Sequence, residues 1–503
     1  MKTDQTLKSS IYVIFCWCFA ACGGLMFGYD IGISGGVTAM NDFLVKFFPR
    51  VYERKMHAKE NNYCKFDDQL LQLFTSSLYL AAVVASFGAS KCCSKFGRRL
   101  TILLASIFFL IGAALSASAQ SLWMLIFGRI FLGFGVGFGN ESVPLFLSEV
   151  APVKRRGSVN IMFQLFITIG ILIANLVNYG TSFLHPHGWR VSLGVAALPA
   201  VLLFVGSFVI PETPTSLVQR GHESKGREAL KKIRGVEEVN EEFEEIKEAC
   251  EKAERAKGSF WEMAKKRSNW PPLVIGVMLQ VFQQFTGINS IMFYAPVLFQ
   301  TVGMKSGASL YSSVITGAFN VLATLLAIFA VDKAGRRFLL LAACVIMFIS
   351  QVTIGGLLLG YLKEANTLTV GMGIVVVVLV CMFVIAFAWS WGPMGWLIPS
   401  ETFPLEMRTE GYACAVSTNM VCTFIIAQAF LSMLCRMRAF IFFFFAAWIL
   451  LMALFVFFLL PETKNVPIDA MVDRVWKLHP VWAKFMDDDD EAARKTAAAV
   501  EQV

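Results

Sequence analysis

Twelve long apolar segments constrain the fold of this chain more than any other feature of its sequence. Each is close to the ~20 residues that an α-helix needs to cross the hydrocarbon core of a bilayer. Hydrophobic residues make up 56% of the 503 residues and charged residues 16%, proportions that exclude an ordinary soluble domain. We therefore predict an all-α polytopic membrane protein with twelve transmembrane helices, at residues 11–33, 69–89, 100–118, 121–143, 158–180, 190–210, 272–300, 310–331, 338–361, 370–398, 411–434 and 439–460.

The short loops between these segments carry their basic residues on one side. These residues are Lys91, Lys95, Arg98 and Arg99 after the second segment, Lys154, Arg155 and Arg156 after the fourth, Lys333, Arg336 and Arg337 after the eighth, and Arg408 after the tenth. Basic residues concentrate in the cytosolic loops of membrane proteins, so this side and both termini are predicted to be cytosolic. The net charge of +8 then reflects topology and contact with anionic lipid, and no nucleic-acid partner is expected.

Three short motifs occur twice, at offsets of about 240 to 250 residues. They are Ser148-Glu149-x-x-Pro152-x-x-x-Arg156 with Ser400-Glu401-x-x-Pro404-x-x-x-Arg408, Gly97-Arg98-Arg99 with Gly335-Arg336-Arg337, and Pro211-Glu212-Thr213 with Pro461-Glu462-Thr463. Each copy follows the same segment of its half. Two six-helix halves in parallel relation, with a substrate bound between them near the midplane, are the layout of a rocker-type secondary transporter.

The repeat divides the chain into four parts. We predict an N-terminal six-helix half at residues 1–210, which includes an outer loop at 36–66, and a C-terminal six-helix half at 272–461. The charged stretch at 211–271 contains glutamate and basic residues at i, i+4 spacing, which supports short solvated helices. It is predicted to be a cytosolic helical linker, and residues 462–503 a cytosolic tail.

Asp30 is the only acidic residue of the first apolar segment, and Arg129 is a charge inside the fourth. An ionisable residue within a membrane span is by default a hypothesis of ion or substrate handling. A change in the separation of a carboxylate and a guanidinium also changes the proton affinity of the carboxylate. We interpret Asp30 and Arg129 as a proton-coupling pair. The alternative is that Asp30 only reaches the outer headgroups.

The repeated motifs on the cytosolic side supply acidic and basic residues that can pair with one another. We predict that they form a cytosolic gate that holds one conformation together. A solvated set of charges without a gating role is the alternative. The acidic members are Glu149, Glu212, Glu401 and Glu462, and the basic members are Arg98, Arg156, Arg336 and Arg408.

Twelve cysteines occur in the chain, and the predicted topology places only Cys64 and Cys435 at the outer face. These two are the only pair exposed to an oxidising compartment. A bridge between them would tie the first outer loop to the end of the eleventh span. Two free thiols are the alternative.

Several motifs together resemble the sugar porters of the major facilitator superfamily, over nearly the whole chain. They are Gly128-Arg129, Pro144-Leu145-Phe146-Leu147-Ser148-Glu149, Gln283-Gln284-x-x-Gly287-x-Asn289, Asp332-Lys333-x-Gly335-Arg336-Arg337 and Trp391-Gly392-Pro393-x-Gly395-Trp396. The run from Phe27 to Val37, the long outer loop with Cys64 and the Trp389-Ser390-Trp391-Gly392-Pro393 sequence narrow the resemblance to the plant monosaccharide–proton symporters called sugar transport proteins. The resemblance implies the major facilitator fold.

A sugar pocket needs particular side chains. The hydroxyl groups of a hexose both donate and accept hydrogen bonds, so amides and an aromatic face suit them. A single buried amide is more often a clasp between helices, worth ~0.6 kcal/mol. The resemblance implies that a set of polar and aromatic residues contacts the sugar and that Phe27, Ile31 and Gly392 close the pocket. The set consists of Gln164, Gln283, Gln284, Asn289, Asn320, Trp396 and Asn419.

We therefore predict a proton-coupled monosaccharide (hexose) symporter of the plasma membrane, which imports sugar by alternating access and is not an enzyme. A facilitative carrier in which Asp30 is only structural is one alternative, and a sugar sensor that does not transport is another. No cofactor or metal is expected, because the histidines are scattered and the glycines from Gly133 to Gly139 lack the preceding strand of a nucleotide-binding motif. A monomer in the lipid bilayer, with a monosaccharide and a proton as its ligands, is the predicted working state.

Overall fold

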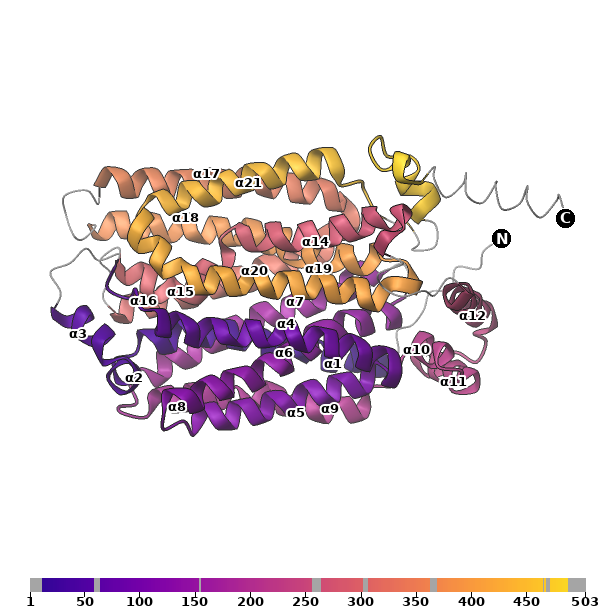
Figure 1. Ribbon diagram of the computed structural model, residues 1–503, viewed down its shortest axis with the longest axis horizontal. Coiled ribbons are helices and arrows are strands. Elements are labelled where there is room, and N and C mark those ends of the chain that lie inside the picture. The colour runs from indigo at the N-terminus through magenta and orange to yellow at the C-terminus, as the bar shows by residue number, and fades with distance from the viewer. Residues whose placement is uncertain are drawn as a thin grey trace.

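The computed structural model describes residues 11–57, 64–152, 155–255, 264–301, 306–361, 369–464, 466 and 471–486. These residues form helices and no strand. The long helices run side by side along the long axis of the molecule (Figure 1). Among the described residues, eleven helical stretches are long and apolar enough to cross a membrane.

Six of these stretches belong to the N-terminal half. Two of the helices begin at capping residues, as sequence rules predict. The Asp68 carboxylate accepts the backbone N–H groups of Leu70 and Leu71 at the start of α4, and the Ser121 hydroxyl accepts that of Met124 at the start of α6. The helices are α1 (Ile11–Ala39), α4 (Gln69–Phe96), α5 (Arg98–Ala117), α6 (Leu122–Val150), α7 (Arg156–Thr181) and the consecutive pair α8 (Gly188–Val195) and α9 (Ala197–Val209).

The C-terminal half contributes the remaining five stretches and one span that is broken in two. The helices are α14 (Trp270–Phe285) and α15 (Ile288–Thr301), which form the broken span, then α16 (Ser306–Ala334), α17 (Arg336–Tyr361), α18 (Val370–Ala388) with α19 (Trp391–Thr402), α20 (Arg408–Met437) and α21 (Phe440–Leu459). The broken span lies where the seventh of the twelve spans is predicted. The prediction of an all-α fold with twelve transmembrane helices is confirmed.

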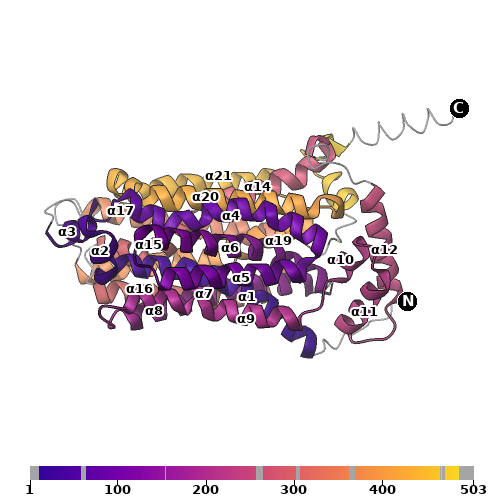
Figure 2. The same cartoon turned by 60° about the horizontal axis from the view of Figure 1, so that its bottom comes forward.

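The two ends of the bundle carry different structures. At one end lie α2 (Asn41–Phe47) and α3 (Pro49–His57), and at the opposite end lie α10 (Pro214–Gln219), α11 (Glu223–Arg234) and α12 (Asn240–Arg255) (Figures 1 and 2). We call these ends the loop end and the linker end. The segment predicted as a loop at 36–66 therefore contains the last turn of α1 and two short helices, and its residues 58–63 lie outside the described part of the chain.

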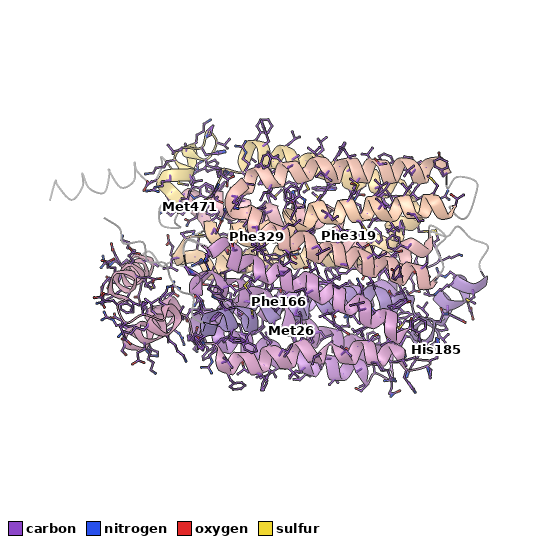
Figure 3. The ribbon with its side chains drawn as sticks, turned by 180° about the vertical axis from the view of Figure 1, so that it is seen from behind. Met26, Phe166, His185, Phe319, Phe329 and Met471 are labelled. Carbon is purple, nitrogen blue, oxygen red and sulfur yellow. A yellow bond between two sulfur atoms is a disulfide. The ribbon has the colours of Figure 1, made fainter. Side chains whose placement is uncertain are left out.

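The first and last spans both reach the linker end. The Tyr12 hydroxyl donates to the carbonyl of Val209, close to the start of the linker. The Trp482 ring N–H donates to the carbonyl of Leu459, which ties residues 471–486 to the end of α21. In Figure 3, Met471 lies at this end and His185 at the loop end.

The outer surface of the bundle is apolar. Phe319 and Phe329 project from α16 with 41% and 71% of their surface exposed (Figure 3). Exposed phenylalanines spread along a helix are unusual in a soluble protein. In a membrane-spanning bundle they are the side chains that contact lipid.

The two halves meet through polar contacts between their helices. Ser86 of α4 and Ser417 of α20 have their hydroxyl oxygens 2.6 Å apart, and Asn175 of α7 donates to the carbonyl of Ser313 on α16 at 3.1 Å. Lipid is as apolar as a leucine side chain, so the hydrophobic effect does not hold transmembrane helices together, and such contacts become important. Aromatic contacts cross the same interface, between Tyr79 of α4 and Phe293 of α15 and between Phe163 of α7 and Trp396 of α19.

Small residues allow α1 and α7 to pack closely. Gly24, Gly28 and Gly32 follow at intervals of one helical turn, and each faces the backbone of α7. A Cβ atom at Gly28 would collide with the carbonyl oxygen of Ile167, whereas one at Gly356 on α17 would meet no atom within 4 Å.

We predict that Gly28→Ala destabilises the fold and that Gly356→Ala does not. Inserting a methyl group into a closely packed contact costs about 1–3 kcal/mol, and the backbone of α7 cannot yield as a side chain can. Thermal unfolding of the purified variants in detergent measures the difference. Equal unfolding temperatures for the two variants would contradict the packing described here.

Candidate functional site

The break in the seventh span lies at Gly287. Its φ of +86° is a conformation that L side chains rarely adopt, and it turns the chain between the end of α14 and the start of α15. Gln283 and Gln284 precede the break and Asn289 follows it. Discontinuous helices of this kind are tolerated in a membrane only where protein surrounds them, and they commonly form substrate sites.

The tenth span is also interrupted, between α18 and α19. Ser390 has φ −134° and ψ −89°, outside the helical region. Within α19, Pro399 has no backbone N–H, so the carbonyl of Gly395 lacks its usual partner four residues on. The Gln280 amide donates to this carbonyl at 2.5 Å, and the Gln283 amide donates to the carbonyls of Trp391 and Gly392 at 3.0 Å each. Side chains of α14 therefore satisfy the irregular backbone of the tenth span.

A cavity of about 40 Å³ lies between the two halves. It is lined by Phe27, Ile31, Gln164, Ile167, Ile171, Gln283, Gln284, Ile288, Asn289, Met292, Asn320, Phe387, Trp396 and Asn419. Nine of the ten residues predicted to bind substrate are among them. The tenth, Gly392, lies beside the cavity, since a Cβ atom there would lie 3.1 Å from the Gln164 amide nitrogen.

Five apolar residues complete the lining and were not predicted: Ile167, Ile171, Ile288, Met292 and Phe387. A signal for two of them exists in the sequence. Ile167 lies three residues after Gln164, and Ile171 lies four residues after Ile167, so all three share one face of the helix. Phe387 lies in the last turn of α18, three residues before the break at Ser390, and no spacing rule identifies it.

The amides of this cavity form a connected network. Asn419 donates to Gln280 at 2.6 Å and to Gln283 at 2.8 Å, and Asn289 donates to Gln284. The Asn320 side-chain oxygen is buried without a hydrogen-bond partner. Donors and acceptors lie close to the apolar faces of Phe27 and Trp396. Such a lining suits a small neutral molecule with several hydroxyl groups.

Asp30 and Arg129 form an ion pair close to this cavity. The two side chains are 1% and 0% exposed, and the Arg129 guanidinium donates to Asp30 Oδ1. It also donates to the Ser34 hydroxyl at 2.8 Å and to the carbonyl of Phe74 at 3.0 Å. The second carboxylate oxygen of Asp30, Oδ2, has no hydrogen-bond partner. A proton can therefore bind at Oδ2 without breaking a contact of the pair.

Cys64 and Cys435 are joined by a disulfide at the loop end. Cys64 precedes α4 in the N-terminal half and Cys435 lies in the last turns of α20 in the C-terminal half. Neighbouring hydrogen bonds join the same two elements: Ser76 donates to Gln428 at 2.6 Å, and Ser432 donates to Asp67 at 2.6 Å. These contacts hold the two halves together at this end, between α4 and α20.

Six of the eight residues of the predicted gate form one cluster within each half at the linker end. Arg98 pairs with Glu149 at 2.8 Å, and Arg336 pairs with Glu401 at 3.2 Å. Glu212 and Glu462 take a different role from the predicted pairing. Their carboxylates accept the first backbone N–H groups of α5 and α17, at Arg98 and Arg336, with distances of 3.0 Å. This is helix capping, in which a carboxylate also complements the positive end of the helix dipole.

The remaining two members of the predicted gate are Arg408 and Arg156. Arg408 donates to the carbonyl of Ser400 at 3.0 Å and, across the interface between the halves, to the Ser148 hydroxyl at 3.3 Å. The side chain of Arg156 lies outside the described part of the structure. Asn160 also bridges the halves at this end, since its amide donates to the Ser400 hydroxyl at 2.7 Å.

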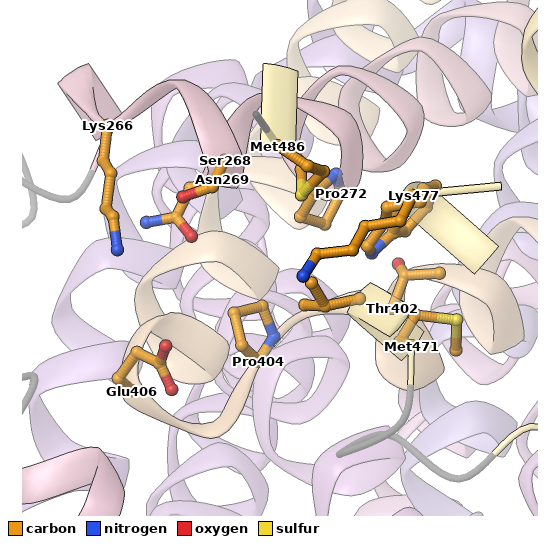
Figure 4. Close-up of a pocket in the computed structure, with 12 residues that line it drawn as sticks. Lys266, Ser268, Asn269, Pro272, Thr402, Pro404, Glu406, Met471, Lys477 and Met486 are labelled. Carbon is orange, nitrogen blue, oxygen red and sulfur yellow. The ribbon is translucent and has the colours of Figure 1, made fainter. Parts of the chain in front are cut away.

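A second cavity, of about 250 Å³, lies at the linker end of the C-terminal half (Figure 4). Residues 471–486 form one wall, with Met471 and Lys477, and the end of α19 forms another, with Thr402. None of the residues predicted to bind sugar or proton lines it. We assign this cavity to the packing of residues 471–486 against the bundle.

The fold and the central cavity define a secondary transporter of the major facilitator type. The chain belongs to the family described as "Sugar (and other) transporter", which it matches over residues 16–476. Sugar transport protein 8 of Arabidopsis thaliana is 63% identical over 484 residues, which are 96% of this chain and 95% of that protein. Sugar transport protein MST4 of Oryza sativa subsp. japonica is 58% identical over 96% of this chain and 94% of its own length. The predicted resemblance to plant sugar transport proteins is confirmed.

Solved structures agree with this assignment. The major facilitator superfamily proton:xylose symporter XylE, bound to 6-bromo-6-deoxy-D-glucose, has a TM-score of 0.80 to this chain at 27% identity. The match covers 92% of this chain and 99% of XylE. The same transporter in a partially occluded inward-open conformation has a TM-score of 0.72.

We predict that Glu149→Ala strongly destabilises the protein. The change leaves the Arg98 guanidinium, 3% exposed, without its carboxylate, and breaking one side of a buried ion pair costs about 3–5 kcal/mol. Glu248→Ala is the matched control, because Glu248 pairs with Lys252 in solvent on α12. Thermal unfolding checks both, and an unchanged unfolding temperature for Glu149→Ala would show that the pair is not structural.

Proposed function

We propose that this protein is a proton-coupled symporter that imports a glucose-like monosaccharide across the plasma membrane. The observation that carries the proposal is the position of the Asp30–Arg129 pair. Asp30 has a free carboxylate oxygen, and its neighbours on α1, Phe27 and Ile31, line the amide cavity. The names of the curated relatives and the proton:xylose symport of XylE support it.

The sugar binds at the amide network. Gln283, Gln284 and Asn289 flank the break in the seventh span and face the cavity, while Gln164 and Asn320 reach it from α7 and α16. Trp396 supplies the aromatic face for the apolar side of the sugar ring. The cavity of about 40 Å³ has room for only a few water molecules. Sugar binding therefore requires the halves to move apart, as alternating access does.

The proton binds to Asp30 Oδ2. Protonation neutralises the carboxylate and weakens its attraction to Arg129, which frees α1 to move relative to α6. Phe27 and Ile31 move with α1, so the protonation state changes the shape of the sugar site. One proton moving down ~100 mV supplies ~2.3 kcal/mol and one pH unit adds ~1.4 kcal/mol, together sufficient for roughly a few hundred-fold accumulation of sugar.

The two repeats move against each other during transport. We assign residues 1–210 and 272–461 as these halves, residues 211–271 as a cytosolic linker and residues 462–503 as a cytosolic tail. The linker end then faces the cytosol, with both termini, and the loop end with its disulfide faces the outside. The arginine–glutamate cluster of each half keeps the cytosolic helix ends of that half rigid. Arg408, Ser148, Asn160 and Ser400 supply contacts across the gate.

The sugar site is tested by Gln283→Ala. This change removes hydrogen bonds from a desolvated pocket, a loss on the order of 1–3 kcal/mol or about one to two decades in apparent affinity. Gln351→Ala is the control, because Gln351 is a buried amide on α17 that does not line the cavity. Saturation curves of labelled hexose uptake measure both, and unchanged affinity for Gln283→Ala would place the pocket elsewhere.

Coupling is tested by Asp30→Asn, compared with Asp42→Asn at the loop end, whose carboxylate pairs with His185. In proteoliposomes, Asp30→Asn is expected to abolish uphill uptake and sugar-induced proton currents while sugar exchange remains. Asp42→Asn is expected to keep both. A pH-stimulated current in Asp30→Asn would contradict the assignment of Asp30, and a wild-type protein that only equilibrates sugar would be a facilitative carrier.

A further inference from the structure

Glu141 is a second carboxylic acid inside a membrane span, and the coupling mechanism above does not use it. It lies in α6 and is 0% exposed. Both of its carboxylate oxygens lack a hydrogen-bond partner in the described structure. An ionised carboxylate in such a place is very costly, whereas a neutral carboxylic acid costs much less. The geometry therefore favours a Glu141 that carries a proton.

The position of Glu141 is between the sugar cavity and the cytosol. Along α6 it follows Arg129 by twelve residues, about 18 Å, and precedes Glu149 by eight, about 12 Å. Neighbouring positions of α6 contact α1 on the cytosolic side of Phe27: a Cβ atom at Gly23 would lie 2.7 Å from Val143. Glu141 therefore lies closer to the cytosol than the sugar cavity does.

Helices of both halves surround this carboxylate. The guanidinium of Arg98 on α5 and the carboxylate of Glu410 on α20 interact electrostatically with the Glu141 carboxyl group. Glu141 interacts in the same way with Cys93 of α4 and with Tyr412 and Cys414 of α20. The Tyr412 hydroxyl is also buried without a hydrogen-bond partner.

The other helices packed against α6 add few charges. Asp30 of α1 and Glu401 of α19 already pair with Arg129 and Arg336. The side chain of Arg156, the first residue of α7, lies outside the described residues, and α10 carries no charged residue.

We propose that Glu141 is a proton-binding site that holds its proton while the cytosolic side is closed and releases it to the cytosol when α20 withdraws from α6. Opening admits water to the carboxyl group. The O–H bond of the acid then breaks, the electron pair stays on the carboxylate, and the proton passes to water. Repulsion between ionised Glu141 and Glu410 favours the open state further. This inference rests on the alternating access of the proposed function, but not on Asp30 as the coupling site.

The sign of the pH effect follows from this arrangement. The closed state binds one proton more than the open state, so acidification favours closure and a rise in cytosolic pH favours opening. One proton corresponds to a tenfold change in the ratio of open to closed protein for each pH unit. This pH dependence applies at pH values above about 4.3, the ordinary pKa of a Glu side chain, because the hydrated carboxylate of the open state is ionised there.

The first test is infrared spectroscopy of the purified full-length protein without sugar. The difference spectrum between wild type and Glu141→Gln at neutral pH is expected to contain the C=O stretching band of a protonated carboxylic acid without hydrogen bonds. Glu410→Gln is the control, because Glu410 is partly exposed, and it is expected to leave this band in place. Absence of the band from the wild type would overturn the proposal.

The second test measures opening directly. Spin labels at K95C and K333C, exposed positions on the cytosolic ends of α4 and α16, report the distance between the halves in a background without other reactive thiols. Wild type, Asp30→Asn and Glu141→Asp are expected to shift toward the open distance about tenfold per pH unit between about pH 5 and 8. Glu141→Gln is expected to lose this dependence, and an unchanged slope in that variant would overturn the proposal.

These measurements separate the two hypotheses. Neither measurement needs sugar. A wild-type protein without sugar-induced proton flux would therefore contradict the proposed symport, while the Glu141 measurements could still be interpreted. Should Glu141→Gln fail to fold, the pH titration of the carboxylic acid band in Asp30→Asn, which lacks the other buried carboxyl group proposed to bind a proton, still decides. A band that persists when the labels report the open state would overturn the release step.

Discussion

Backbone hydrogen bonding inside a bilayer is the constraint on which the rest of this structure depends. Lipid offers no partner for an N–H or C=O group, so each spanning segment must satisfy its own backbone. Irregular backbone is then tolerated only where protein surrounds it. The chain breaks its seventh span at Gly287 and its tenth at Ser390, and both breaks lie at the central cavity.

The breaks explain why amides gather at this cavity. Pro399 leaves the carbonyl of Gly395 without an N–H partner, and Gln280 supplies one. Gln283 donates to the carbonyls of Trp391 and Gly392 at the start of α19, while its own oxygen accepts from Asn419. Amides therefore hold the broken spans together and present hydrogen-bonding groups to the cavity. A hydroxylated ligand can exchange partners with this network, which makes the site both polar and able to rearrange.

The sequence predicts the fold well because apolar length and basic loops are strong signals. The pocket amides could be predicted only through the resemblance to sugar porters, because the membrane spans also hold other buried amides, among them Asn140, Asn178 and Gln351. Ile288, Met292 and Phe387 could not, because apolar lining residues look like any other apolar residue of a span. The role of Glu212 was also beyond the sequence: its Pro-Glu-Thr motif shows a charge near arginines, but only the geometry shows that the carboxylate caps α5.

Three buried ionisable residues follow one another along α6. From the loop end to the linker end, α6 carries Arg129 paired with Asp30, Glu141 without a hydrogen-bond partner, and Glu149 paired with Arg98. Pro144 lies between Glu141 and Glu149 and allows the helix to bend there, so a tilt of the part of α6 before Pro144 changes the surroundings of Arg129 and Glu141 together. The Asp30–Arg129 pair is held in place further, because Arg129 also donates to the Ser34 hydroxyl and the carbonyl of Phe74. Glu141 has no such contacts, so its protonation state depends most directly on whether α20 lies against α6.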